Sequence, residues 1–437
     1  MSSKQKTTTT KDEATPALVP KLRFPEFRGA GDWTTETLGS VAKISTEKVR
    51  DNTCIPMSIT SGFGLVSQME KFGRIIAGSS YANYLLLKKN DFAYNKSATK
   101  EYPEGFIALY SGDELAAVPN SIFTCFCIKG GSPVPQYLNY LFLGNLHGKW
   151  LRNFIEVGAR AHGSLSIDED DLLALPVPVP SGKASVREQQ KIAECLSSVD
   201  ELMAAQARKL AALKTHKKGL MQQLFPREGE TQPRLRFPEF QNAGEWEEKS
   251  LGQLIEIASG QVDPKQPPYC DSPQIGSENI ESHSGKLVNV KTAGDKGVIS
   301  GNYAFDENDI LYSKIRPALN KVAAPAFTGI CSADIYPIRP ADGSLLRNYL
   351  FYLLLSQDFL DYAIRNSERG KIPKINRDAL VTYKTLIPSP AEQQRIATCM
   401  SSLDALITAE TQKHEALKTH KKGLMQQLFP SPEEVAA

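Results

Sequence analysis

The chain has little of what marks a membrane or secreted protein. Its richest apolar run, Tyr349 to Leu355, is far shorter than the roughly 20 residues that a membrane-spanning helix needs. Residues 1–20 contain almost no large apolar side chains, which argues against a secretory signal and predicts a disordered leader. The seven cysteines include no Cys-x-x-Cys pair, and no histidine stands at a spacing suited to zinc. We therefore expect a reduced, cytoplasmic protein with no metal site and no contact with a membrane.

Catalytic motifs are also missing. None of the Gly-Lys pairs is followed by the Ser or Thr with which a Walker A motif ligates magnesium, and there is no Gly-x-Ser-x-Gly elbow. The chain has no Asn-Pro-Pro-Tyr motif, which an amino-methyltransferase would use to hold its target amine. It also has no Pro-Asp dipeptide to open a nuclease-type acidic cluster. These absences predict a protein without catalytic residues of its own.

The charge of the chain is nearly balanced, with 51 Lys and Arg against 49 Asp and Glu and a net charge of +2. This balance argues against a polycation that coats DNA indiscriminately. It leaves local nucleic-acid binding open, because a basic patch matters more than the sum of the charges.

A long internal repeat dominates what is present. The sequence ALKTHKKGLMQQLFP occupies residues 212–226 and occurs again, unchanged, at residues 416–430. The motif LRFPEF occurs at Leu22–Phe27 and at Leu235–Phe240, and each copy is followed by a tryptophan and then by a Leu-Gly pair. Because each repeat covers about half of the chain, it is too long for a solenoid unit. The pattern predicts a duplicated domain followed by a duplicated tail.

Each tail has the heptad pattern of a long coiled-coil helix. Apolar residues recur at alternating steps of four and three positions, as at the a and d positions of a coiled coil. Capping boxes that start at Ser185 and Ser389 would begin the helices, and Pro226 and Pro430 would stop them. The predicted seam consists of Ile192, Leu196, Val199, Met203, Leu210, Leu213, Leu220 and Leu224 in the first tail, and of Ile396, Met400, Leu403, Ile407, Leu417, Leu424 and Leu428 in the second.

A narrow apolar seam needs a partner helix, so neither tail would be a stable helix alone. We predict that the two tails pair with each other as an intramolecular coiled coil. Polar seam positions such as Gln206, Lys217 and Glu410 would weaken the pair but fix its register. The alternative is that each helix packs only on its own globular domain.

The two segments in front of the tails share a skeleton but differ in most of their sequence. The run from Asn90 to Lys96 aligns with the run from Asn308 to Lys314, and each segment ends in a Pro-rich, strand-like stretch. Short β-branched and aromatic runs separated by Gly, Asn and Asp predict many strands, and hence a mixed α/β (α+β) domain in each half. The predicted organisation is a leader (1–20), two globular domains (21–184 and 234–389), two helices (185–226 and 390–430), a linker (227–233) and a tail (431–437).

Basic residues mixed with Gly, Ser, Asn and aromatic residues occur at matched places in both globular domains. Phosphate contacts favour Lys, Arg and Ser, and base edges favour Arg, Asn, Gln and Ser. Any one of these segments alone could be an ordinary charged loop, but their presence in both domains favours a role in DNA binding. The candidate residues are Tyr94, Lys96, Ser97, Lys100, Arg160, His162 and Ser164 in the first domain, and Tyr312, Lys314, Arg316, Lys321, Arg369, Lys371 and Lys374 in the second.

On these motifs the chain resembles the specificity (S) subunits of type I restriction-modification systems. The resemblance rests on the LRFPEF motif, the Pro-rich strand that leads into Glu-Gln-Gln and the long heptad helix, each present twice, and it covers roughly residues 21–430. It implies two similar target recognition domains separated by two long antiparallel coiled-coil helices and related by a pseudo-twofold axis. Each domain would recognise one half of a bipartite, asymmetric DNA site.

The resemblance also implies partners. The helices would dock two methyltransferase (M) subunits, and restriction (R) subunits would join this core on double-stranded DNA in the bacterial cytoplasm, as a defence against phage. S-adenosylmethionine would serve adenine methylation in the M subunit, and ATP and Mg would bind to the R subunit. This chain itself would hold no cofactor and catalyse nothing. Two alternatives remain: a coiled-coil adaptor that does not bind DNA, and a fused methyltransferase.

Overall fold

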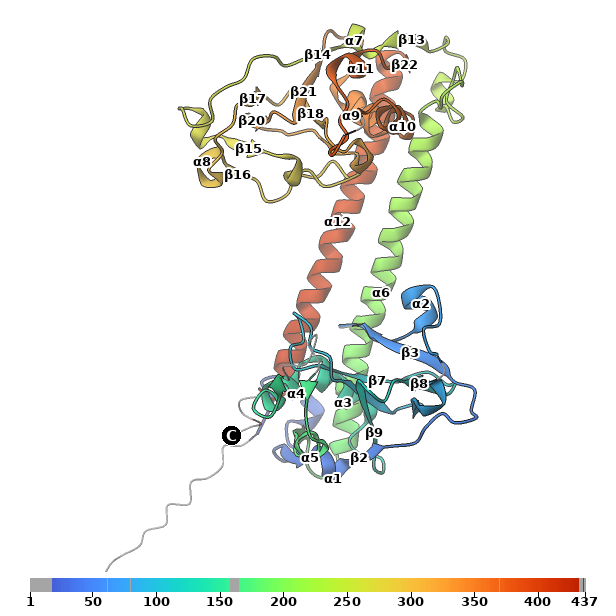
Figure 1. The fold of residues 1–437 in the computed structure, drawn as a ribbon, viewed down its shortest axis with the longest axis vertical. Helices are drawn as coiled ribbons and strands as arrows, with labels where there is room; N and C mark the ends of the chain where they lie inside the picture. Colours follow the sequence, from blue (N-terminus) through green and yellow to red (C-terminus); the bar gives the residue numbers. More distant parts are fainter. Residues whose placement is uncertain are drawn as a thin grey trace, which may run out of the picture. The chain divides into compact units, whose positions relative to one another are not determined.

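The computed structural model divides the chain into two compact units (Figure 1). The first unit comprises the chain up to Ala205 together with the segment from His414 onward, and the second unit runs from Gln206 to Lys413. Each unit therefore contains one globular domain and one stretch of each long helix. The structure describes residues 18–60, 62–78, 80–157, 165–368, 370–431 and 435.

The domain of the first unit is built on two four-stranded sheets. One sheet is antiparallel, with the order β2-β9-β6-β7, and the other has the order β4-β3-β8-β5 with β3 and β8 parallel. A separate antiparallel pair joins β1 to β12, so the start and the end of the domain lie side by side. The elements are η1 (Pro25–Phe27), β1 (Thr34–Thr37), α1 (Leu38–Val41), β2 (Ala42–Ser45), β3 (Ile55–Thr60), β4 (Gly64–Ser67), α2 (Gln68–Phe72), η2 (Tyr81–Asn83), β5 (Leu85–Leu87), β6 (Phe92–Asn95), β7 (Phe106–Leu109), β8 (Ala116–Val118), β9 (Phe123–Ile128), α3 (Pro135–Leu143), α4 (Leu146–Leu151), β10 (Glu156–Val157), β11 (Leu165–Ser166), α5 (Glu169–Leu173) and β12 (Pro176–Val179).

The domain of the second unit repeats this plan. Its antiparallel sheet has the order β14-β21-β18-β19, its second sheet has the order β16-β15-β20-β17 with β15 and β20 parallel, and β13 pairs with β22. The elements are η3 (Pro238–Phe240), β13 (Glu247–Ser250), α7 (Leu251–Leu254), β14 (Ile255–Ile257), η4 (Tyr269–Asp271), β15 (Pro273–Ile275), η5 (Ser277–Asn279), β16 (Lys291–Thr292), α8 (Ala293–Lys296), β17 (Asn302–Phe305), β18 (Ile310–Ser313), η6 (Pro317–Leu319), β19 (Val322–Ala323), β20 (Gly329–Ser332), β21 (Ile335–Pro340), α9 (Arg347–Leu355), α10 (Gln357–Arg365), α11 (Arg377–Val381) and β22 (Lys384–Ile387).

The two sheet systems correspond strand by strand, down to the single parallel pair in each second sheet. Their cores correspond as well. Tyr94 and Tyr137 are fully buried in the first domain, as Tyr312 and Tyr349 are at the matching places in the second. The duplication of sequence is thus a duplication of fold, and the predicted mixed α/β class is confirmed.

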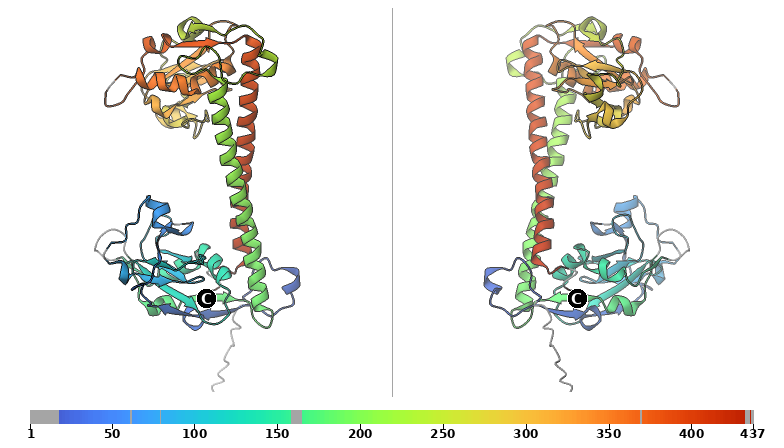
Figure 2. Two further views of the ribbon diagram at one scale, coloured as in Figure 1. Left: turned by 90° about the vertical axis from the view of Figure 1, so that its right-hand side faces the viewer. Right: turned by 90° about the vertical axis from the view of Figure 1, so that its left-hand side faces the viewer.

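The two long helices predicted from the heptads are present as α6 (Ser185–Leu224) and α12 (Pro390–Leu428). Within each unit a stretch of α6 lies beside a stretch of α12 (Figure 2). Seam residues at the helix ends are buried, and those nearer the middle are half-buried, because only the ends also pack on a domain. The buried ones are Ile192, Leu196, Val199, Leu224, Ile396, Met400 and Leu428; the half-buried ones are Met203, Leu210, Leu213, Leu220, Leu403, Ile407, Leu417 and Leu424. Each helix pairs with the other and also packs on domain cores, so the predicted pairing of the two tails is present.

Polar residues in the seam pair across it. Gln206 and Glu410 occupy equivalent positions of the repeat and meet each other, with the Gln206 amide donating to the Glu410 backbone oxygen at 2.9 Å and to its carboxylate. The Lys217 ammonium binds Asp404, whose carboxylate also accepts a bond from the Tyr352 hydroxyl at 2.8 Å. The repeat provides the same arrangement in the first unit, where Lys421 and Tyr140 bind Asp200. The later residue of α6, Lys217, meets Asp404, whereas the earlier residue, Gln206, meets Glu410, so the two helices run antiparallel.

A buried ion pair joins the LRFPEF motif to the start of a long helix in each unit. Arg23 donates from Nε and Nη2 to the two carboxylate oxygens of Glu188, at 2.7 and 2.8 Å, and Arg236 binds Glu392 in the same way at 2.8 Å for both contacts. The two glutamate side chains are only 1% exposed. The capping box predicted at Ser185 is wrong. The Glu188 carboxylate, which would complete it, binds Arg23 instead, and the Glu188 backbone N–H donates to the Ala184 oxygen ahead of the helix.

The predicted leader covers residues 1–20, of which 1–17 lie outside the described residues. Leu18 forms a β-bridge with Trp33, and its backbone oxygen accepts a bond from the Trp33 N–H at 2.9 Å. Pro20 is buried. The last residues of the predicted leader therefore belong to the folded first unit.

We expect Glu392→Ala to lower the free energy of unfolding by about 3 kcal/mol, because it leaves the Arg236 charge largely buried without a partner. Glu248→Ala removes an exposed ion pair with Lys384 and should cost less than about 1 kcal/mol. Chemical denaturation of both variants checks the difference. Equal effects of the two substitutions would contradict the importance of the buried pair.

Candidate nucleic-acid interface

In the second unit, the two basic segments predicted to contact DNA lie side by side although about 60 residues separate them in the sequence. Ile315 forms a β-bridge with Lys374. The Arg316 N–H donates to the Pro373 oxygen at 2.7 Å, and the Ile375 N–H donates to the Lys314 oxygen at 2.9 Å. These backbone bonds fix the loop that follows α10 against the chain that leaves β18.

The cations of this loop pair differ in their exposure. Lys371, Lys374 and Arg316 are exposed, and Arg316 has a left-handed backbone with φ of 49°. Lys374 forms an ion pair with Glu368 at 3.3 Å. Lys314 is half-buried, with its ammonium 5.3 Å from the centre of the Tyr336 ring. The exposed side chains can therefore reach a polyanion, Lys374 by exchanging Glu368 for it, whereas Lys314 is held closer to the domain.

Lys321 has a different setting from the other predicted cations. Its side chain is half-buried, and the ammonium donates to the Ser277 backbone oxygen at 2.5 Å. The structure therefore assigns this lysine a bond inside the domain, between the start of β19 and the short helix η5. It is not part of the exposed basic surface formed by Arg316, Lys371 and Lys374.

In the first unit, the residue that follows the second predicted segment is bound to the first predicted segment. The Leu165 N–H donates to the Lys96 oxygen at 2.8 Å, which matches the bond from Ile375 to Lys314 in the second unit. Lys96 and Ser97 are half-buried, and Lys100 is exposed. The predicted contacts Arg160, His162 and Ser164 lie outside the described residues, as does Arg369 of the second unit.

Two of the predicted contact residues are inaccessible. Tyr94 and Tyr312 are 0% and 2% exposed, because they stand on central strands whose side chains fill the domain core. The Tyr94 hydroxyl donates to the Glu104 backbone oxygen at 2.8 Å. A DNA duplex could not reach either ring, so neither tyrosine belongs to the DNA interface.

The loop that carries Lys100 is anchored by polar residues that sequence reasoning missed, namely the buried Glu104 and His147 and the exposed Arg152. The Glu104 carboxylate is bound by the Arg152 guanidinium at 2.7 Å, and Nε2 of His147 lies 3.3 Å from the Gly105 backbone oxygen. Burial lowers the pKa of His147 to about 4, so the ring is neutral at pH 7. These residues lie more than 40 positions apart along the chain, and no local spacing or motif links them.

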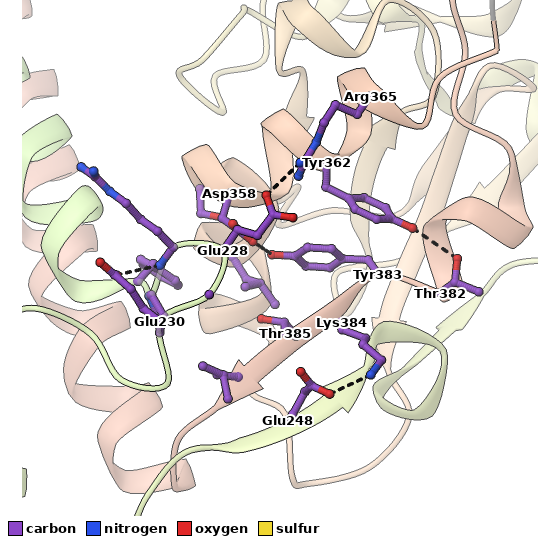
Figure 3. Close-up of a pocket in the computed structure, with 17 residues that line it drawn as sticks. Glu228, Glu230, Glu248, Asp358, Tyr362, Arg365, Thr382, Tyr383, Lys384 and Thr385 are labelled. Atoms are coloured by element: carbon purple, nitrogen blue, oxygen red, sulfur yellow. Dashed lines mark hydrogen bonds and ion pairs between the residues drawn. The ribbon is translucent and has the colours of Figure 1, made fainter.

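A cavity of about 300 Å³ lies in the second unit, beside the end of α6 (Figure 3). Its carboxylates are occupied by neighbours: Glu228 pairs with Arg365 at 2.8 Å, Glu248 pairs with Lys384 at 2.9 Å, and Asp358 accepts a bond from the Tyr383 hydroxyl at 2.7 Å. Burial, followed by the nearby Asp358 charge, raises the pKa of Tyr383. Because neighbouring side chains already bind these carboxylates, we do not interpret the cavity as a reactive site.

The structure defines the class of protein. It is an internally duplicated scaffold in which two α/β domains share one pair of helices and carry matched loops. Comparison with known proteins identifies this class. The model of the type I restriction modification DNA specificity domain matches residues 243–419. The chain is 26% identical over 410 residues to the type I restriction enzyme EcoDI specificity subunit of Escherichia coli, covering 88% of this chain and 84% of that protein.

Other relatives agree. The putative type I restriction enzyme MjaX specificity subunit of Methanocaldococcus jannaschii is 26% identical over 308 residues, which covers 68% of this chain and 67% of that one. A chain from a structural study of complex assembly and conformational transition in a type I restriction-modification system has the same fold, with a TM-score of 0.56, 16% identity and coverage of 92% and 98%. The S subunit of M. genitalium gives a TM-score of 0.53 at 13% identity, with coverage of 95% and 100%.

Residues 243–419 thus match the type I restriction modification DNA specificity domain, and most of the chain is similar to specificity subunits of type I restriction-modification systems. Within such a system the specificity subunit is a non-catalytic component, as the missing catalytic motifs had predicted. Among the residues that the structure describes, no helix is both long and apolar enough to cross a bilayer.

We expect Lys371→Gln combined with Lys374→Gln to weaken DNA binding about equally for all sequences. The variant should reduce the slope of log K against log salt by about 1.8, if each lysine neutralises one phosphate. Titrations of labelled duplex at several salt concentrations measure this slope, in the presence of the methyltransferase subunit. The control is Lys384→Gln, which removes an exposed, ion-paired lysine of the same unit that lies outside the loop pair; an identical slope for both variants would remove the loop from the interface.

Proposed function

We propose that this chain directs a type I complex to a bipartite, asymmetric DNA sequence, with one half recognised by each α/β domain. The observation that supports this most directly is the matched pair of backbone bonds, from Leu165 to Lys96 and from Ile375 to Lys314. In the second unit this bond joins two basic segments, and in the first it joins Lys96 to the residue that follows the second predicted segment. The frameworks are alike and the loop sequences differ, as expected if two domains face two different half-sites.

The domain organisation fits this proposal. We propose target recognition domains at residues 21–184 and 234–389 and spacer helices at residues 185–226 and 390–430. Two domains of the same fold, each presenting loops at the same place, would each read one half-site, as the two halves of a dimeric repressor do. Since the loops of the two domains differ, the two half-sites should differ in sequence as well.

We also propose that the helices dock two methyltransferase subunits, which would methylate adenine with S-adenosylmethionine, and that restriction subunits with ATP and Mg join this core. The support comes from exposed residues that packing does not constrain. In the identical segments of the two helices, Lys, Thr, His and Lys are exposed in both copies, at Lys214, Thr215, His216 and Lys218 and at Lys418, Thr419, His420 and Lys422. That solvent-facing residues are identical in the two helices would be explained if the same kind of partner bound once to each helix.

Mapping of methylated adenines in host DNA tests the recognition role. The chain, expressed with its neighbouring methyltransferase, should produce one bipartite motif that disappears when the chain is deleted. Replacement of residues 28–180 by the corresponding residues of another specificity subunit should change one half of the motif and leave the other half intact. Methylation that persists unchanged without this chain would rule out the recognition role and favour a coiled-coil adaptor.

A second test addresses docking. Leu202 and Leu406 occupy equivalent positions of the repeat and are 57% and 41% exposed, so the same apolar side chain faces solvent at the same place on both helices. We expect Leu202→Glu or Leu406→Glu alone to leave one methyltransferase subunit bound per chain, and the double variant to leave none, as measured by native mass spectrometry. Val186→Glu is the control, because Val186 is exposed on the same helix but its repeat equivalent is Pro390. Two subunits bound to the double variant would place the docking surface elsewhere.

A further inference from the structure

One aromatic side chain of the first unit stands out by its exposure. Phe63 is 86% exposed, more than any other large apolar residue that the structure describes. It lies at the tip of the hairpin formed by β3 and β4, where its N–H donates to the Thr60 oxygen at 3.0 Å. Neighbouring Gly62 and Gly64 have φ of 80° and 106°, values that other residues rarely adopt. The backbone is thus shaped to hold the ring away from the domain.

The hairpin tip lies beside the loop that carries the predicted DNA contacts of the first unit. A β-carbon placed on Gly62 would be 3.6 Å from the Tyr102 hydroxyl. Tyr102 belongs to the same loop as Lys96 and Lys100, which the Glu104 anchor holds in place. The exposed ring and the exposed Lys100 therefore belong to adjacent loops of one surface.

Cationic side chains occur on helix α2, which directly follows the hairpin. The Lys71 ammonium donates to the Ser58 hydroxyl at 3.4 Å and to the Ile59 backbone oxygen, both on β3. Arg74, just after α2, is exposed. An exposed aromatic tip on a hairpin that is followed by lysine and arginine suits single bases or opened base steps, because the ring stacks on the bases while cations meet the phosphates.

We propose that Phe63 inserts into the DNA duplex as an aromatic wedge that unstacks a base step in the half-site bound by the first unit. This proposal rests on the proposed DNA recognition function and adds a residue that deforms the DNA. The affinity for the first half-site would then depend on how easily its base steps unstack, as well as on direct contacts with the bases. The cost of unstacking would be lowest at flexible pyrimidine–purine steps.

The second unit has a different connection at the matching place. There the chain from β15 to β16 contains η5 and a bridge between Ile280 and Leu287, and Val290 is the exposed large apolar side chain of this connection in the described part of the chain. Valine has no ring to stack on a base. The wedge should therefore act on only one of the two half-sites.

The experiment uses the full chain in complex with its methyltransferase subunits and a duplex that carries the mapped recognition sequence. 2-Aminopurine, whose fluorescence rises when it is unstacked, replaces single bases of each half-site, except for the adenine that is methylated, because methyltransferases extrude their target base. The unaltered complex should raise the fluorescence at one step of the first half-site. Phe63→Ala should abolish that rise and weaken binding by about 10-fold to 100-fold, the range of one lost base–aromatic stack, whereas Phe63→Trp should retain both.

Phe72→Ala is the matched control, because Phe72 is exposed at 45% on the adjacent helix α2 but does not stand at the hairpin tip; it should bind DNA normally. Normal affinity and an unchanged fluorescence rise with Phe63→Ala would overturn the wedge while leaving the recognition function intact. Loss of the methyltransferase subunits from Phe63→Ala would also overturn it and identify the hairpin as a protein contact. If the unaltered complex failed to bind the duplex at all, the recognition function itself would be contradicted, and the wedge with it.

Discussion

Each half of this protein depends on one buried ion pair. The arginine of an LRFPEF motif binds the glutamate in the first turn of a long helix, 165 residues away in the first unit and 156 in the second. A glutamate that is only 1% exposed would be very costly to leave unpaired. The front of each domain is therefore tied to the helix that follows it, and this tie sets the direction in which the helix leaves the domain.

The helix pair adds a second constraint, which is its register. A purely apolar seam could slide by a heptad at small cost, but a polar residue in the seam must find its own partner. Gln206 hydrogen-bonds to Glu410. Lys217 and Lys421 each form an ion pair with an aspartate that also accepts a hydrogen bond from a tyrosine. Because these pairs repeat across the duplication, they support the same arrangement in both units, and they allow the loops of the domains to differ.

This division between framework and loops explains how such a chain can change what it binds. The strand order, the buried tyrosines and the arginine–glutamate pairs are the same in both domains. The connections between corresponding strands are not, as the short β3–β4 hairpin and the longer path from β15 to β16 show. Contacts made by loops on a rigid framework can vary without loss of the fold. The structure is thus suited to carry two unrelated recognition surfaces on one support.

The sequence by itself determined the duplication, the two long helices and the seam between them, because heptad spacing and repeated motifs are visible along a single stretch of chain. It also located the paired basic segments. Only the tertiary structure decided that Tyr94 and Tyr312 are core residues, that Glu188 binds an arginine instead of capping its helix, and that the exposed Phe63 lies on the loop next to the one that carries Lys100. Each of these depends on contacts between residues far apart in the chain, and such contacts leave no periodic pattern in the sequence.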